Sequence, residues 1–295
     1  MKRGETSEKS LFSESKRLAE ITKLLRQVFE LWGYEEVFLP SIEEYNSNLR
    51  RGLKIAHNNR FYLVKPDITS QIVCNLKNHE ILKVYYLSEV LERINGTWQA
   101  GIEFIGGRTL QSGIEVLSVV ITSLEKLGIE NFYIDIGSLQ TWKNAVAGLE
   151  EHEDKIFSAL EKRNLGLIES LPISQAKKEK LQELLHFRGK ESGIERLDKI
   201  IQYLNDERVF IDLGTIRPLS YYEDLIFEIY SPSFGHPIGG GGEYLVNDLT
   251  GFGFAFDLTT LKELSPRKTM KKRINIKGNL MDAYQKARAL VNQVC

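Results

Sequence analysis

The sequence predicts an α+β fold with a mixed, mainly antiparallel sheet of about six strands flanked by helices. The first indication is a hairpin, because β-prone runs at 84–90 and 98–105 flank the dipeptide Asn95–Gly96. The second is an amphipathic helix at 18–29, where apolar residues recur at three- and four-residue spacing. The third is the stretch 139–205, where strand patterns vanish and helical ones dominate. A helical insertion therefore divides a β-rich domain.

Further elements are expected along the chain in the following order. Residues 2–13 are polar and charged and are expected to be a loose lead-in. A strand through Val37 and Leu39 runs into Pro40, and a strand at 61–64 gives way, through a proline, to a helix that carries Ile72, Val73 and Leu76. Later patterns predict helices at 113–127, 142–160, 177–185, 194–204 and 281–293, and strands at 132–136, 209–213, 225–230 and 252–258.

Four segments follow from these patterns. They are a loose N-terminal segment at 1–13, one domain assembled from 14–138 and 206–261, the helical insertion at 139–205, and a basic tail at 262–295. The tail holds nine Lys or Arg and two Asp or Glu and carries a net charge of +7, which leaves −8 for the rest of the chain. Such a tail can serve nucleic acid or an acidic protein, or it can be a solvated helix.

Composition excludes several classes of protein. A content of 42% hydrophobic and 27% charged residues is that of a globular domain, and the net charge of −1 gives no overall attraction to nucleic acid or membranes. Cys74 and Cys295 lie far apart, and the five histidines share no helical face, so neither a disulfide framework nor a metal site is expected. No signal-peptide or membrane-span pattern is present, which predicts a cytoplasmic protein.

Polar residues of the second hairpin strand form the first candidate binding site. Gln99, Gly101 and Glu103 alternate with apolar residues and therefore share one face of the strand. They suit the floor of a site for a small polar ligand, or else line the solvent face of an ordinary hairpin. Asp67 and Thr69 precede a helix and are either helix caps or groups that face a ligand amine.

The second candidate region lies between residues 215 and 242. The Tyr221–Tyr222 pair is either core packing or, beside Arg217, part of a cation-and-aromatic wall. The four glycines at 239–242 lack the ending of a phosphate-binding loop, which favours a strand that passes close to a neighbouring backbone or a ligand.

Taken in order, these motifs resemble the catalytic domain of class II histidyl-tRNA synthetases over about residues 14–261. The matching motifs are Val64-Lys-Pro-Asp-Ile-Thr69, Gln99-Ala-Gly-Ile-Glu103, Arg217-Pro-Leu-Ser-Tyr-Tyr222, Gly241-Gly-Glu-Tyr244 and Gly251-Phe-Gly-Phe-Ala-Phe-Asp-Leu258. Within that superfamily the chain most resembles the regulatory subunits of ATP phosphoribosyltransferase, and the insertion segment at 159–165 is similar to the pattern of that subgroup. The resemblance implies the class II synthetase fold.

Departures from the synthetase pattern fall at positions that hold ATP phosphates in that family. Glu92, or a shifted Arg93, and Thr260 stand where synthetases have arginines, and Glu243 replaces another arginine. Each lost charge-assisted contact is worth about 1.5–3 kcal/mol of binding. The hairpin loop and the tail are also shorter than those of synthetases. The resemblance therefore implies that adenylation and aminoacylation are lost and that no residue is catalytic.

The amino-acid side of the pocket is retained, which suggests histidine sensing. By resemblance, Asp67, Thr69 and Gln99 hold the amino group and neighbouring atoms of the ligand, and Glu103 and Tyr222 lie in the imidazole-recognising region. Arg217 contacts the carboxylate side, and Tyr221 is counted with these histidine-binding residues. Lys65 stands where the family usually has arginine.

The resemblance also implies partners. It implies a non-catalytic regulatory subunit that is needed by the short-form catalytic ATP phosphoribosyltransferase, which joins ATP to phosphoribosyl pyrophosphate in the first step of histidine biosynthesis. L-histidine is the expected effector. A homodimer through the Pro40 segment, within a hetero-octamer, is expected, without a cofactor, a membrane or a nucleic acid. The alternatives are a residual synthetase paralogue and a tRNA-binding module.

Overall fold

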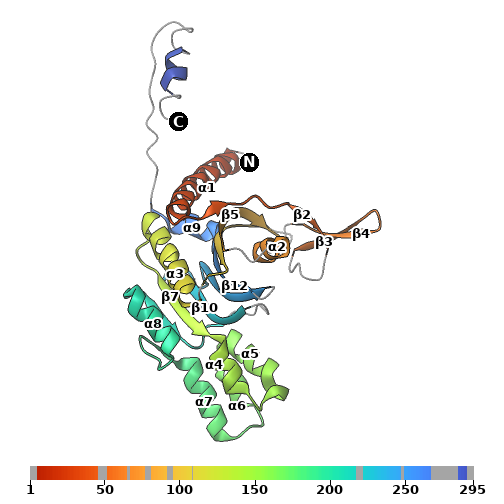
Figure 1. The fold of residues 1–295 in the computed structure, drawn as a ribbon, viewed down its shortest axis with the longest axis vertical. Coiled ribbons are helices and arrows are strands. Elements are labelled where there is room, and N and C mark those ends of the chain that lie inside the picture. Colours follow the sequence, from red (N-terminus) through yellow and green to blue (C-terminus); the bar gives the residue numbers. More distant parts are fainter. Residues whose placement is uncertain are drawn as a thin grey trace.

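The structure is a computed structural model that describes residues 5–45, 52–64, 67–76, 81–91, 96–107, 109–216, 222–246, 249–266 and 285–290. A large twisted sheet forms the centre of the molecule, with a helical layer on one face and a group of short helices at one end (Figure 1). The predicted α+β fold is confirmed.

The main sheet has nine strands rather than about six. Their order is β1 (Glu35–Glu36), β5 (Leu82–Val90), β6 (Thr97–Ile105), β12 (Leu249–Asp257), β11 (Gly239–Val246), β10 (Tyr222–Tyr230), β7 (Tyr133–Ser138), β9 (Val209–Asp212) and β8 (Arg188–Gly189). Neighbouring strands from β5 to β7 are antiparallel, whereas β1 with β5 and β7 with β9 are parallel. The edge strands β1 and β8 are two residues long. The strand predicted through Val37 and Leu39 is wrong, because β1 ends at Glu36 and residues 37–40 form no strand.

The hairpin predicted from the Asn-Gly dipeptide is confirmed. Strands β5 and β6 pair in one continuous register, in which Val84 lies opposite Glu103 and Ser88 lies opposite Gln99. Asn95 itself lies outside the described residues, and Gly96 precedes β6. Since β6 also pairs with β12, this hairpin is fixed inside the sheet rather than at its rim.

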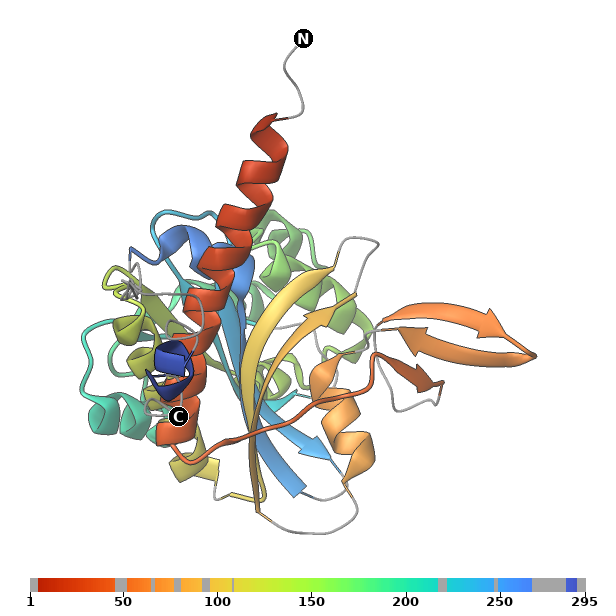
Figure 2. The ribbon, with the colours of Figure 1, turned by 90° about the horizontal axis from the view of Figure 1, so that it is seen from above.

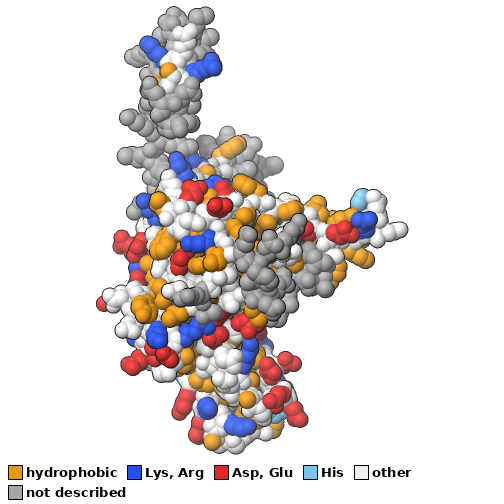
Figure 3. All heavy atoms as spheres, viewed as in Figure 1, with side chains coloured by type: hydrophobic (Ala, Val, Ile, Leu, Met, Phe, Trp, Pro, Cys, Tyr) orange, Lys and Arg blue, Asp and Glu red, His pale blue; other side chains and the backbone are white. Residues whose placement is uncertain are grey.

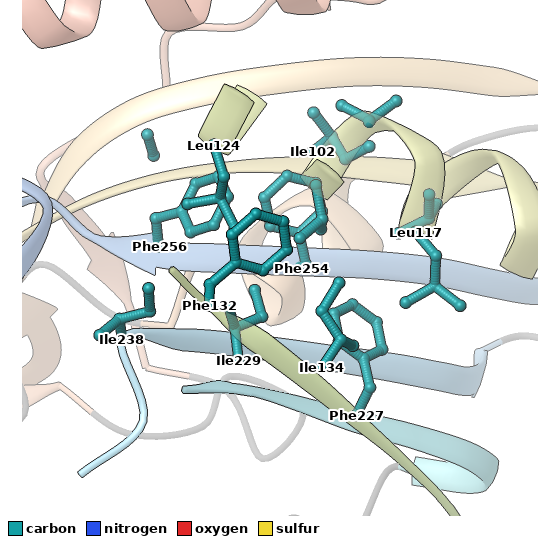
Figure 4. Packing of buried hydrophobic residues seen from close by; sticks show 14 of the residues in the cluster. Ile102, Leu117, Leu124, Phe132, Ile134, Phe227, Ile229, Ile238, Phe254 and Phe256 are labelled. Atoms are coloured by element: carbon teal, nitrogen blue, oxygen red, sulfur yellow. The ribbon is translucent and has the colours of Figure 1, made fainter. Parts of the chain in front are cut away.

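One face of the sheet is covered by α1 (Glu5–Leu31), α3 (Thr109–Lys126), α8 (Glu195–Leu204) and α9 (Leu258–Leu264). Figure 4 shows Leu117 and Leu124 of α3 packed over phenylalanine and isoleucine side chains of the strands. Helix α1 begins at Glu5, so the prediction of a loose segment is wrong from that residue onward. The segment is polar but contains no glycine or proline between Glu5 and Leu31 to interrupt a helix.

The helical insertion has a core of its own. Helices α4 (Leu139–Val146), α5 (Glu153–Glu161), α6 (Leu165–Glu169) and α7 (Gln175–His186), with the short 3-10 turn Glu150–His152, pack around the buried Trp142. The Trp142 indole Nε1 donates to the Leu213 carbonyl at 2.5 Å and so ties the insertion to the strand side of the domain. A single helix over 142–160 was expected, but Gly148 has φ +76° and the chain turns there.

Helix α8 belongs to the main core and not to the insertion. Leu197 and Ile200 are buried in the cluster formed by α1, α3 and the sheet. The segment 139–205, predicted as one insertion, therefore divides between two cores.

A small sheet projects from the domain and is called the arm here. It consists of β2 (Ile42–Glu44), β4 (Arg60–Val64) and β3 (Leu53–His57), in that order (Figure 2). Asn58 and Asn59, both with positive φ, form the turn between β3 and β4. The strand predicted at 61–64 is confirmed, and helix α2 (Ile68–Asn75) follows it.

Candidate functional site

A buried carboxylate, Glu103 on β6, is the centre of the candidate site. Its residue is 1% exposed, which excludes the solvent-face interpretation for this position. The Thr69 hydroxyl donates to Oε1 at 2.6 Å, and the Tyr244 hydroxyl donates to Oε2 at 2.5 Å. Both carboxylate oxygens thus have a donor, as a buried charged group requires.

Glycines on the neighbouring strand make room for this carboxylate. Gly253 lies directly opposite Glu103 in the register of β6 and β12. A Cβ atom at Gly253 would stand 2.0 Å from Glu103 Oε2, and one at Gly251 would stand 2.1 Å from the Tyr244 ring. Both side chains of the Glu103–Tyr244 pair therefore cross strand β12 at positions without side chains.

Helix α2 brings Thr69 to the site. Asp67 is the N-cap of this helix, and its side chain accepts from Ser70 N at 3.0 Å. The capping role expected for Asp67 is thus present, and it orients the first turn of α2 so that Thr69 reaches Glu103.

The pKa of Glu103 is raised from 4.5 to about 7, chiefly because the carboxyl group is buried. The hydrogen bonds from Thr69 and Tyr244 lower the pKa, and the nearby Asp67 carboxylate raises it further. Near neutral pH this group therefore exchanges between a carboxylate, which accepts hydrogen bonds, and a carboxylic acid, which also donates one. Either form can bond a ring nitrogen of an imidazole.

The other predicted residues lie as follows. Gln99 is partly buried on the same face of β6 as Glu103 and is in register with Asp257. Tyr222, also partly buried, begins β10, and a Cβ atom at Gly242 would lie 2.9 Å from its ring. Arg217 and Tyr221 lie outside the described residues, as do Lys65, Glu92 and Arg93.

The glycine run forms the first half of β11 and packs tightly against β12. A Cβ atom at Gly241 would stand 2.0 Å from the Gly253 carbonyl oxygen. The glycines thus allow close approach of a neighbouring backbone, which is one of the two expected roles.

Glu243, expected to mark a lost phosphate contact, points away from Glu103. Tyr244 bonds Glu103 on one face of the sheet, so the preceding residue on β11 faces the other. There Glu243 Oε2 is paired with Arg196 Nη1 at 2.7 Å. Thr260, the other described position of this kind, is buried within α9.

Sequence reasoning missed Tyr244 as a site residue. The available signal was its position within Gly-Gly-Glu-Tyr, two residues after Gly242 and hence on the same strand face. It also missed Arg196, which nothing in the local sequence of α8 distinguishes from a solvent-facing residue.

The described ranges contain neither a candidate metal site nor a candidate membrane-spanning helix. No group of three or more His, Cys, Asp or Glu side chains is arranged to hold a metal ion in that part of the chain. Among the helices described there, none is long and apolar enough to cross a membrane.

A family model described as histidyl-tRNA synthetase matches residues 7–200 and 175–261, which together span most of the chain. The chain belongs to the histidyl-tRNA synthetase family. Known relatives include both synthetases and regulatory proteins, as the motifs predicted. A histidine–tRNA ligase from Methanocaldococcus jannaschii is 28% identical over 275 residues, covering 78% of this chain and 66% of that protein.

An ATP phosphoribosyltransferase regulatory subunit from Thermoanaerobacter sp. (strain X514) is 30% identical over 278 residues, covering 78% of this chain and 72% of that protein. Among solved structures, a chain of the ATP phosphoribosyl transferase (HisG:HisZ) complex from Thermotoga maritima superimposes with a TM-score of 0.69 at 21% identity. That match covers 80% of this chain and 96% of the other. The structural match supports the shared fold.

Proposed function

We propose that the chain is a non-catalytic regulatory subunit of ATP phosphoribosyltransferase that activates a short-form catalytic subunit in the cytoplasm and conveys feedback by L-histidine. Relatives that bear the regulatory-subunit name, at about 28–30% identity, support the proposal. The main structural support is that Glu103 is held by two hydroxyl donors. By resemblance, Glu92, or a shifted Arg93, and Thr260 stand where a synthetase has arginines.

In this proposal histidine binds with its imidazole against Glu103. Glu103 accepts from, or donates to, a ring nitrogen, and Gln99 and Asp67 bond the ligand ammonium, while Arg217 pairs with the ligand carboxylate. The Thr69 and Tyr244 hydroxyls fix the orientation of Glu103 before the ligand arrives. Without phosphate-binding arginines, ATP does not bind beside the histidine.

Feedback requires that histidine bind one arrangement of the complex more tightly than the other. A coupling free energy of about 1–3 kcal/mol suffices for a physiological response. The histidine site thus acts on a partner whose active site lies in another chain.

The decisive experiment measures phosphoribosyl-ATP formation by the short catalytic subunit with and without this chain, across a histidine titration. We expect activation by the chain and its reversal by histidine. Gln99→Ala and Glu103→Ala variants should still activate but should need at least about tenfold more histidine for inhibition, and a Glu151→Ala variant, changed at an exposed insertion residue, is the matched control. An unchanged rate with a folded catalytic partner would refute the proposal.

Residual synthetase activity is the second candidate, because the relative from Methanocaldococcus jannaschii is named a histidine–tRNA ligase. Histidine-dependent exchange between ATP and pyrophosphate distinguishes the two functions. The replaced arginines lead us to expect no exchange, and exchange above background would favour the synthetase candidate.

We also propose that the arm forms a homodimer contact near Pro40, within a hetero-octamer. Ile42, Leu53 and Phe61 of the arm are 53%, 46% and 64% exposed, and hydrophobic side chains lie along it among charged ones (Figure 3). A Phe61→Ser variant should weaken dimerisation at least about tenfold, since burying a phenylalanine is worth about 1.5–3 kcal/mol. Sedimentation velocity measures this, with Tyr203→Ser on α8 as control, and equal dimer affinities would place the contact elsewhere.

A further inference from the structure

An ion triad lies behind the candidate site, on the face of the sheet opposite Glu103. Arg196, the second residue of α8, places its Nη1 atom 2.9 Å from Asp224 Oδ2 and 2.7 Å from Glu243 Oε2. Asp224 belongs to β10 and Glu243 to β11. One nitrogen atom of one helix therefore joins two adjacent strands.

The triad lies where β10 is irregular. The register of β10 against β11 shifts between Tyr222 and Ile226, and Asp224 lies within that shift. Asp224 also accepts from the Ser138 hydroxyl at 2.5 Å and from Gln140 N at 3.2 Å, so strand β7 and helix α4 join the same cluster. An irregular strand start has few ladder hydrogen bonds, and these side-chain contacts replace them.

The same two strands carry aromatic residues of the site on their other face. Tyr244 directly follows Glu243 and donates to Glu103. Tyr222 lies opposite Tyr244 in the register of β10 and β11, before the irregularity that contains Asp224. Successive residues of a strand point to opposite faces, so a displacement of the Glu243 backbone moves Tyr244 with it. The triad thus holds the strand segments that carry two site residues, which it does not touch.

We propose that Arg196 is a positioning residue for the histidine site, holding the start of β10 and the end of β11 so that Tyr222 and Tyr244 stay around Glu103. This inference rests on the proposed histidine binding at Glu103. Arg196 itself does not contact the ligand and acts through the two strands.

Because Glu243 is buried, loss of Arg196 should displace strand β11. The Glu243 side chain is only 6% exposed, so removal of Arg196 leaves a buried carboxylate without its cation. Such a carboxylate recovers solvation only if the end of β11 moves outward. Tyr244 would then leave Glu103, and the site would lose one of its two hydroxyl donors.

The geometry also supplies a conservative variant. Arg196 uses Nη1 for both carboxylates, and within the described ranges its buried Nε and Nη2 atoms have no hydrogen-bond partner. A lysine ammonium, which is a compact charge with three hydrogen-bond donors, can therefore bond both carboxylates in place of Arg196 Nη1. Arg196→Lys should retain the site, whereas Arg196→Met, which keeps the apolar stem, should not.

Isothermal titration of L-histidine into the full chain tests the inference. We expect Arg196→Met to raise the histidine Kd at least about tenfold and Arg196→Lys to keep it within about threefold of wild type. Lys199→Met is the matched control, because Lys199 lies on the same helix and pairs with the exposed Glu195. The Kd for the catalytic subunit should be equal in all four proteins, which a general loss of structure would not allow.

Each outcome has one meaning. Equal histidine affinity of Arg196→Met and wild type, or equal weakening in the Met and Lys variants, refutes the positioning role alone. Absence of histidine binding by the wild type refutes the proposed function and this inference with it. If Arg196→Met does not fold, Glu243→Gln provides the test. This variant removes the ion pair between Arg196 and Glu243 without leaving a buried charge. Urea unfolding checks that it folds, and its histidine Kd should again be higher than that of the wild type.

Discussion

Replacement of Glu103 by Gln provides a test of the buried carboxylate that does not require a ligand. The substitution preserves the shape of the side chain and removes its charge. In the wild type, burial raises the pKa of this group from 4.5 to about 7. The folded state therefore binds its proton more tightly than the unfolded state does between these two values.

The sign of the effect follows from that difference. As pH rises from 4.5 to 7, the unfolded chain loses the Glu103 proton first, so the free energy of unfolding of the wild type falls. A tenfold change in proton affinity corresponds to about 1.4 kcal/mol, so the rise of the Glu103 pKa from 4.5 to about 7 makes the ionised group destabilising by about 3 kcal/mol above pH 7. The Glu103→Gln variant, which is uncharged at this position, does not carry this penalty.

Urea unfolding at a series of pH values from about 4.5 to 8 measures the difference between the two proteins. We expect the stability of Glu103→Gln relative to wild type to rise by about 3 kcal/mol across that range, with most of the rise below pH 7 and the denaturant slopes unchanged. Glu151→Gln, at an exposed residue, should show a flat difference. Parallel pH profiles for wild type and Glu103→Gln would show that Glu103 titrates normally and would refute the argument.

Three further changes should affect stability. Gly253→Ala places a methyl group 2.0 Å from Glu103 Oε2 and should lower the free energy of unfolding in urea by about 1–3 kcal/mol. Gly235→Ala, which has open space around its Cβ position, should leave that free energy nearly unchanged, and equal effects of the two variants would contradict the close packing. Thr69→Val removes a donor to the buried carboxylate and should lower the free energy of unfolding by about 1–3 kcal/mol above pH 7. The loss should be smaller at pH 5, where Glu103 is protonated, and an equal loss at both pH values would contradict this explanation. Trp142→Phe removes the indole hydrogen bond to the strand side of the domain and should lower stability by about 1–3 kcal/mol; an unchanged midpoint in thermal melts would show that this bond adds nothing.

Elements with a regular side-chain pattern could be predicted from the sequence. The β5–β6 hairpin was indicated by alternating residues and an Asn-Gly dipeptide, and its pairing fixes Gln99 and Glu103 on one face. The glycine run was correctly interpreted as a strand in close contact with its neighbour. Such features depend on local sequence, so no knowledge of the rest of the fold is needed.

Features made by distant residues could not be predicted. Arg196 meets Asp224 and Glu243 only because α8 packs on the main core, and a single arginine in an amphipathic helix carries no sign of such partners. The strands β2 and β3 of the arm were missed because they have mostly exposed side chains and little apolar alternation. The start of α1 was missed because polarity was taken as evidence against a helix.

The central position of β12 governs the order in which this domain can form during synthesis. Gly251 of β12 pairs with Ile105 of β6 and with Tyr244 of β11, so the two halves of the sheet meet only when β12 has been made. At about 5–20 residues per second, the ribosome needs on the order of 10 s to go from β6 to β12. Throughout that time β6 presents a row of unpaired backbone N–H and C=O groups. Pairing of this edge with another nascent chain therefore competes with correct folding, and we expect the yield of folded protein to depend on chaperones that cover it.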